Sequence, residues 1–203
     1  MMKKYNINQT TLLILGLYKN NYATSLHLRE IARQTHIDVK AVQLQLKKLE
    51  KLNVTKSIQK GRNKNYSLNL NNYLTKYYMI LTETYATITY LDKNFEIKKL
   101  INEINDKIED SALIFGSFAK NEMTPESDID LLIISDIKPD LDAIQETGQL
   151  MDREINIKVT TKEKFLKGLQ NNDPLILEIV ANHIILKGID IICNAMWLYY
   201  AKP

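Results

Sequence analysis

Two aspartates one residue apart, Asp128 and Asp130, are the side chains of this chain best suited to chemistry. They lie in the stretch SDIDLLII at residues 127–134, whose apolar, β-branched end predicts a buried strand. Because side chains alternate along a strand, both carboxylates are expected on one face. Carboxylates on one face make a poor core. They suit Mg²⁺, which takes one or two of them together with the phosphates of a substrate.

A Gly-Ser pair precedes the aspartates, directly after an apolar run at residues 112–115. Gly116 allows a tight turn and a close approach of a phosphate to the backbone. Ser117 is expected to cap the next helix, where its hydroxyl and neighbouring N–H groups can hold an anion. A phosphate cradle and a metal clamp together suit in-line attack on a nucleoside triphosphate, in which metal ions stabilise the attacking and leaving oxygens.

The Gly-Ser pair and the later Ser-Asp-x-Asp-Leu resemble the DNA polymerase β-type nucleotidyltransferase superfamily, in particular its minimal stand-alone members. The resemblance covers residues 97–188. It implies a mixed sheet with flanking helices, Mg²⁺ as cofactor, and a nucleoside triphosphate as substrate or ligand. The metal ligands that it implies are Asp128 and Asp130, and the nucleotide-binding residues are Gly116, Ser117 and Lys120.

One residue of the family's catalytic version is replaced in this chain. That version uses a third carboxylate from the next strand, which is expected here at residues 154–159. Asn156 stands at the aligned position, and a neutral amide is a weaker ligand for a hard cation than a carboxylate. Glu154 shares the face of Asn156 and is a candidate to supply the third acid as a catalytic residue. Lys158 also shares it and is a candidate to pair with one aspartate in place of a metal.

Two alternatives follow for this domain. In the first it is an enzyme: the aspartates hold Mg²⁺, a nucleotidyl group passes to an acceptor, pyrophosphate leaves, and Glu154 or the acceptor supplies general-base help. In the second the fold serves a DNA-binding regulator as a nucleotide sensor or dimerisation block. Asn156 favours the second. Lys120 stands where the family commonly has Arg, and keeps the charge without the bidentate phosphate geometry.

Positive charge is concentrated in the first third of the chain. Residues 1–70 contain 13 Lys and Arg against 3 Asp and Glu, whereas the whole chain has 27 against 24. A net charge of +10 on a segment of this size predicts binding to a polyanion.

The pattern within residues 1–70 predicts a winged helix-turn-helix. Apolar spacing and the caps Asn8 and Asp38 predict helices at 9–18, 28–35 and 38–52, followed by strands at 54–59 and 65–70 around a basic turn at 60–64. This order resembles prokaryotic transcription regulators, in which the third helix enters the major groove of double-stranded DNA. The residues expected to contact DNA are Lys40, Gln43 and Lys47 on the third helix, and Arg62 and Lys64 on the wing.

Residues 71–93 predict a helix that joins two domains. Tyr, Leu and Ile recur there at spacings of three and four. The apolar face is broader than one packing partner requires, so a homodimer is expected. The predicted organisation is a winged helix-turn-helix at 1–70, the linker helix at 71–93 and a nucleotidyltransferase-like domain at 94–203. Helices and strands alternate in the last domain, which is typical of an α/β fold. The whole chain is therefore expected to be an α+β or α/β protein of two domains.

Composition limits the remaining classes. The hydrophobic fraction is 45%, which argues against disorder. Cys193 is the single cysteine, so no internal disulfide can form and a cytoplasmic location is expected. No apolar run approaches the length of a membrane span, so no membrane partner is expected. Some minimal nucleotidyltransferases act as antitoxins, which makes a toxin a further candidate partner.

Overall fold

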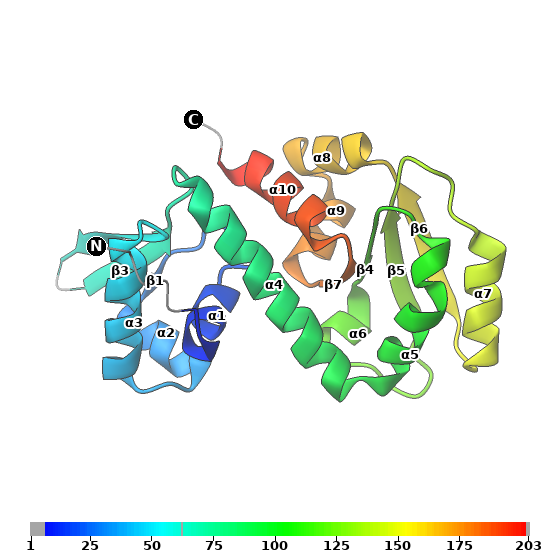
Figure 1. The fold of residues 1–203 in the computed structure, drawn as a ribbon, viewed down its shortest axis with the longest axis horizontal. Helices are drawn as coiled ribbons and strands as arrows, with labels where there is room; N and C mark the ends of the chain where they lie inside the picture. Colours follow the sequence, from blue (N-terminus) through cyan, green and yellow to red (C-terminus); the bar gives the residue numbers. More distant parts are fainter. Residues whose placement is uncertain (1–6, 62, 202–203) are drawn as a thin grey trace. The chain divides into compact units, whose positions relative to one another are not determined.

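The structure, a computed structural model, describes residues 7–61 and 63–201. The chain forms two compact units, one ending at Thr82 and the other beginning at Glu83. Figure 1 shows their helices and strands coloured along the sequence. Among the described residues, no helix is both long enough and apolar enough to cross a membrane. Arg62, one of the predicted DNA contacts, lies outside the described residues.

The helices and hairpin of the first unit lie within two residues of their predicted positions. They are α1 (Gln9–Gly16), α2 (Leu28–Thr35), α3 (Val39–Lys51), β2 (Thr55–Lys60) and β3 (Asn63–Leu68). The two predicted caps are present: Asn8 Oδ1 accepts from Thr11 N at 2.9 Å, and Asp38 Oδ1 accepts from Lys40 N at 2.9 Å. These bonds satisfy backbone donors that a helix start leaves without partners, which is why the helices begin there.

The sheet of the first unit differs from the prediction in two places. A short strand, β1 (Leu26–His27), pairs with β3 and gives the strand order β1-β3-β2. The hairpin turn is also tighter, because Lys60 pairs directly with Asn63 and Gly61 adopts a positive φ of 59°. Lys64 therefore lies opposite Gln59 within the hairpin rather than at its tip.

The core of the first unit includes the apolar side of α3. Val42, Leu46 and Leu49 are fully or almost fully buried. The sheet is tied to this core by Tyr18, whose hydroxyl donates to Tyr66 O at 3.0 Å. Burial raises the pKa of the Tyr18 hydroxyl, so it remains a donor at neutral pH.

Helix α4 (Tyr73–Lys93) is found where the linker helix was predicted, and it contributes residues to both units. In the first unit, Tyr73, Tyr77 and Leu81 are exposed at a spacing of four residues, while Tyr78 and Met79 are buried. In the second unit, Thr87 Oγ1 donates to Ile185 O at 2.6 Å.

The second unit contains a four-stranded mixed sheet with the order β6-β5-β4-β7, as predicted for a mixed sheet with flanking helices. The strands are β4 (Ser111–Ile114), β5 (Ile129–Ile134), β6 (Ile155–Thr160) and β7 (Ile184–Lys187). β4 runs antiparallel to β5 and β7, and β5 runs parallel to β6. A parallel pair needs a crossover, and α7 (Leu141–Leu150) supplies it.

One face of this sheet packs against α5 (Phe95–Ile104) and α7. Ile129, Leu131 and Ile133 of β5 are buried in one cluster with apolar residues of both helices. Because side chains alternate, Asp130 and Leu132 point to the opposite face. A 3-10 turn at Asn105–Lys107 directly follows α5. The remaining helices are α6 (Gly116–Lys120), α8 (Lys162–Gln170), α9 (Pro174–Ala181) and α10 (Ile189–Tyr200).

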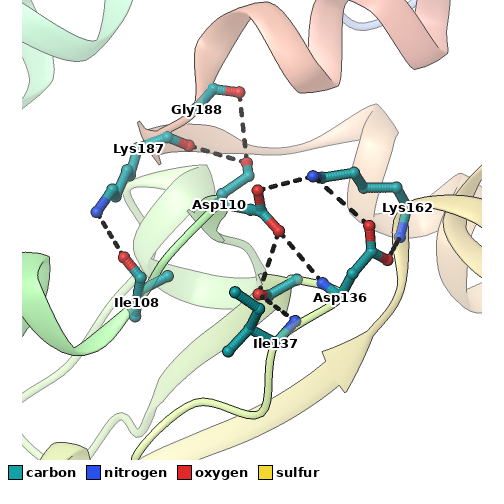
Figure 2. Close-up of polar contacts among 9 residues, drawn as sticks. Ile108, Asp110, Asp136, Ile137, Lys162, Lys187 and Gly188 are labelled. Carbon is teal, nitrogen blue, oxygen red and sulfur yellow. Dashed lines mark hydrogen bonds and ion pairs between the residues drawn. The ribbon is translucent and has the colours of Figure 1, made fainter.

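Polar contacts fix the end of the sheet where β4 begins and where β5 and β6 end (Figure 2). The Asp110 carboxylate accepts from Ser135 Oγ and from Asp136 N, both at 3.2 Å. Lys162 Nζ lies 2.7 Å from Asp110 and 3.6 Å from Asp136. The hydrogen bond from Lys162 lowers the pKa of Asp110. These contacts hold three strands in register at the end opposite Gly116.

Candidate functional site

Gly116 and Asp130 are in direct contact at the other end of the sheet. Gly116 begins α6 with a positive φ of 65°. A Cβ added to Gly116 would lie 2.1 Å from Asp130 Oδ2, so the Asp130 carboxylate occupies the space that any other side chain would need. Phe115 N also donates to Asp130 O at 3.1 Å. The structure thus brings the Gly-Ser turn and one of the two aspartates together.

Asn156 is the direct neighbour of Asp130 on the adjacent strand. The two residues are paired in the register of β5 and β6. Asn156 Nδ2 donates to Asp130 Oδ1 at 2.9 Å. The amide therefore faces Asp130 with its nitrogen, which cannot bind a cation, in the position where the resemblance implies a third carboxylate.

Asp128 lies directly before β5 and is exposed. Among the described residues, its carboxylate forms no hydrogen bond and no ion pair. Glu154 is also exposed, and its backbone oxygen accepts from Ile129 N at 2.9 Å. Within residues 7–61 and 63–201, Lys158 forms no ion pair with Asp128 or Asp130. A lysine that pairs with an aspartate in place of a metal is therefore not observed.

Two carboxylates, those of Asp128 and Asp130, could donate to a metal ion at this site. In residues 7–61 and 63–201, no group of three or more His, Cys, Asp or Glu side chains lies close enough to hold a metal. Mg²⁺ commonly takes one or two carboxylates and completes its shell with water and substrate phosphates. Asp128 and Asp130, neither of which has a cationic partner among the described residues, fit that requirement.

Ser117 does not cap α6, contrary to the prediction. The N-cap is Phe115, and Ser117 is the second residue of the helix. Because α6 begins at Gly116, Ser117 already lies within the first turn, past the N-cap position. Tyr90 of α4 supports α6, because its hydroxyl donates to Phe118 O at 3.0 Å. Burial raises the pKa of Tyr90 to about 12. Lys120 ends the helix and lies 3.8 Å from the exposed Glu178.

Arg153 is a residue of this region that sequence analysis missed. It precedes β6, and its guanidinium contacts Glu96 and the backbone of the loop before Asp128. Its partners are distant in sequence, and three of them are backbone carbonyls, which carry no sequence signal. The predicted boundary of a strand at Glu154 also left Arg153 in a loop.

The predicted DNA-contacting residues of α3 share one exposed face. Lys40, Gln43 and Lys47 are exposed, and spacings of three and four place them on the same side of the helix. Lys64 is engaged within the unit instead. Its Nζ lies 3.0 Å from a Glu50 oxygen and 5.1 Å from the centre of the Tyr66 ring, and the hydrogen bond to Glu50 raises the pKa of Lys64.

Residues 97–186 match the family model described as "Nucleotidyltransferase domain". The match confirms that this part of the chain resembles a nucleotidyltransferase domain. Comparisons with curated proteins and with solved structures gave no match. The nucleotidyltransferase domain therefore lies within the second unit, contains the Gly116–Asp130 contact, and supports a function of the nucleotidyl-transfer type.

Proposed function

We propose that the nucleotidyltransferase domain binds a nucleoside triphosphate together with Mg²⁺ held by Asp128 and Asp130. The observation that carries this proposal is the seating of the Asp130 carboxylate against the backbone of Gly116. A strand with a buried apolar face thereby brings a carboxylate to the Gly116 turn, where α6 begins. Two carboxylates with no cationic partner among the described residues favour a bound cation.

The neighbouring residues suit the phosphates of that ligand. Ser117 carries a hydroxyl donor one residue from the Gly116 turn, and Lys120 adds a positive charge at the end of the same short helix. The ion pair of Lys120 with Glu178 is long and exposed, so little free energy is lost when Lys120 turns to a phosphate. When bound, Mg²⁺ would neutralise charge on the phosphate oxygens.

Binding without transfer is the activity that the site geometry supports best. Asn156 offers Asp130 an amide N–H where a third carboxylate would complete the usual catalytic set. Nucleotidyl transfer to an acceptor is the second candidate, and the match of residues 97–186 to the nucleotidyltransferase family favours it. Glu154, two residues before Asn156, would then be the candidate for the general base.

The first unit is proposed to bind double-stranded DNA as a winged helix-turn-helix. The order of three helices and a hairpin supports this, as does the exposed face of Lys40, Gln43 and Lys47 on α3. Lysines that neutralise phosphates release counterions, so binding should weaken steeply as salt increases. Exposed Tyr73, Tyr77 and Leu81 support a homodimer through α4. The combined proposal is a nucleotide-sensing DNA-binding regulator.

Thermal unfolding with and without ATP and Mg²⁺ tests the nucleotide site. The melting temperature should rise with ATP and Mg²⁺ together, and the D128A/D130A double variant should lose that rise. Labelled ATP then separates the candidates, because transfer leaves label on an acceptor and sensing leaves none. A melting temperature that ATP and Mg²⁺ do not change in the unmutated protein would contradict both.

A further inference from the structure

We propose that Arg153 is a positioning residue. It links the loop that precedes Asp128 to α5, and it also contacts α6. The inference rests on the proposed function only in assigning a metal to Asp128. The contacts that fix the loop are independent of any ligand.

The guanidinium of Arg153 is anchored on α5. Nε and Nη2 both face the carboxylate of Glu96, and the Nη2–Oε2 distance is 3.3 Å. This is the side-on, two-point geometry that Arg forms with carboxylates and that Lys cannot reproduce. The side chains are 18% and 33% exposed, so solvent screens this pair less than an ordinary surface pair.

The remaining nitrogen of the fork holds the loop. Nη1 donates to the carbonyl oxygens of Pro125 and Ser127, the latter at 3.3 Å, with Thr124 O at 3.5 Å. The loop closes on itself through Thr124 N, which donates to Ser127 Oγ at 2.8 Å. Asp128 is the next residue, so the position of Ser127 determines where the Asp128 carboxylate starts.

Arg153 also contacts the helix that carries Ser117. Its guanidinium carbon lies 5.8 Å from the centre of the Phe118 ring, within the range of a cation–π contact. Phe118 is buried and follows Ser117 directly in α6. One side chain therefore touches the helix of the Gly-Ser turn and the loop before Asp128.

Backbone hydrogen bonds tie the start of the loop to α6, where Asn121 N and Glu122 N donate to Phe118 O and Ser117 O. The rest of the loop depends more on Arg153. Residues 121–126 are all exposed, so apolar burial does not anchor them. Arg153 itself is well placed to act as an anchor. Its backbone N donates to Gly148 O at 3.0 Å, at a glycine where a Cβ would lie 2.8 Å from Arg153 O.

The test uses Arg153→Lys and Glu96→Gln in the full chain, with Lys98→Met as the matched control. Lys98 is a neighbouring cation whose ion-pair partner, Asp92, is exposed. Amide hydrogen exchange, measured without nucleotide, should rise at least about tenfold in both variants at Thr124 and Ser127, whose amides donate hydrogen bonds within the loop. The reason is that the charge-assisted hydrogen bonds of Arg153 are lost. Exchange in α8, and throughout Lys98→Met, should match the unmutated protein.

A second measurement separates positioning from general destabilisation. The dissociation constant for ATP is measured with Mg²⁺ and with EDTA. Displacing Asp128 should weaken the Mg²⁺-dependent affinity about tenfold and leave the affinity in EDTA unchanged. A purely structural defect would weaken both equally.

The outcomes distinguish the two proposals. Loop exchange that is unchanged in Arg153→Lys and Glu96→Gln overturns the positioning role, whatever the nucleotide data show. Equal weakening with Mg²⁺ and with EDTA overturns it as well. If the loop exchanges faster but the unmutated protein binds no ATP, Arg153 keeps its role and the proposed nucleotide site fails.

Discussion

Asn156 Nδ2 donates a 2.9 Å hydrogen bond to Asp130 Oδ1 across two parallel strands. Asn156→Asp places two carboxylates in that contact. Like charges this close disfavour double ionisation, so the variant should melt at a lower temperature than the unmutated protein when EDTA is present. Mg²⁺ should reverse the difference and bind at least about tenfold more tightly, because it would bridge the two acids.

The measurement for Asn156→Asp is the melting temperature during a Mg²⁺ titration. Gln149→Glu, the same amide-to-acid change at an exposed position of α7, is the control for added charge. A Mg²⁺ response no larger than that of the control would show that Asn156 does not occupy a metal-ligand position.

Gly116→Ala should disrupt the site through the backbone. Alanine is strained at a φ of 65°, and its Cβ would lie 2.1 Å from Asp130 Oδ2. We expect a loss of about 1–3 kcal/mol in the free energy of unfolding and no response of the melting temperature to ATP with Mg²⁺. Gly16→Ala in α1, where a Cβ meets no atom within 4 Å, is the control. A normal ATP response in Gly116→Ala would contradict the Asp130 contact as the basis of the site.

Glu50→Gln should strengthen DNA binding by the first unit. Glu50 holds Lys64 at 3.0 Å and also accepts from Ser57 Oγ at 2.5 Å. Removing its charge releases Lys64 toward DNA phosphates, so affinity should rise several-fold, and the salt dependence should steepen by up to about one counterion. Glu30→Gln on α2 removes the same charge away from the hairpin and serves as the control. Equal gains in both variants would assign the effect to net charge alone, which fluorescence anisotropy over a salt series can decide.

Lys162→Met should change how stability depends on pH. Lys162 lowers the pKa of Asp110 in the folded protein, so the ionised carboxylate adds stability above the ordinary pKa of an aspartate. That contribution is lost as the pH falls through the lowered pKa. Lys162→Met should therefore melt earlier than the unmutated protein at neutral pH, and the difference should shrink as the pH falls below the ordinary pKa of an aspartate.

The control for Lys162→Met is Lys167→Met, which removes the exposed pair with Glu163 one helical turn away. Melting curves between about pH 2 and pH 7 make the comparison. A difference between the Lys162→Met variant and the unmutated protein that is independent of pH would exclude Asp110 as its source.

The features predictable from this sequence were those with a local signal. Asn8 and Asp38 predict where α1 and α3 begin. Each side-chain oxygen accepts from a backbone N–H no more than three residues later in the sequence. The alternation around Asp130 predicted its face of the sheet, and the register with Asn156 followed from the parallel strands. β1 was not predicted, because two residues are too few to show the alternation of apolar and polar side chains that is typical of a strand.

The remaining features depend on contacts between distant residues. Arg153 acts through Glu96, 57 residues away, and through carbonyl groups that every residue possesses. Ser117 follows a common capping pattern, but α6 begins at Gly116, before Ser117 in the sequence. The contact of His183 with Glu83 has no local signal either, because Glu83 lies 100 residues earlier.

His183 and Glu83 form a buried pair in the second unit, with side chains 1% and 2% exposed. His183 Nδ1 lies 2.8 Å from Val180 O, and a carbonyl only accepts, so Nδ1 carries a proton. Nε2 faces Glu83 Oε1 at 3.3 Å, and one further proton is needed between them. Removal of either residue would therefore take a buried polar contact away from the other.

His183→Leu or Glu83→Leu should each lower the free energy of unfolding by about 3–5 kcal/mol, because each removes a buried polar contact of the other. The double variant replaces both with apolar groups and should lose much less than the sum of the single variants. Urea unfolding of the four proteins measures this coupling. Additive losses would show that the two side chains contribute by packing alone, since a shared proton or charge makes the second substitution cheaper than the first.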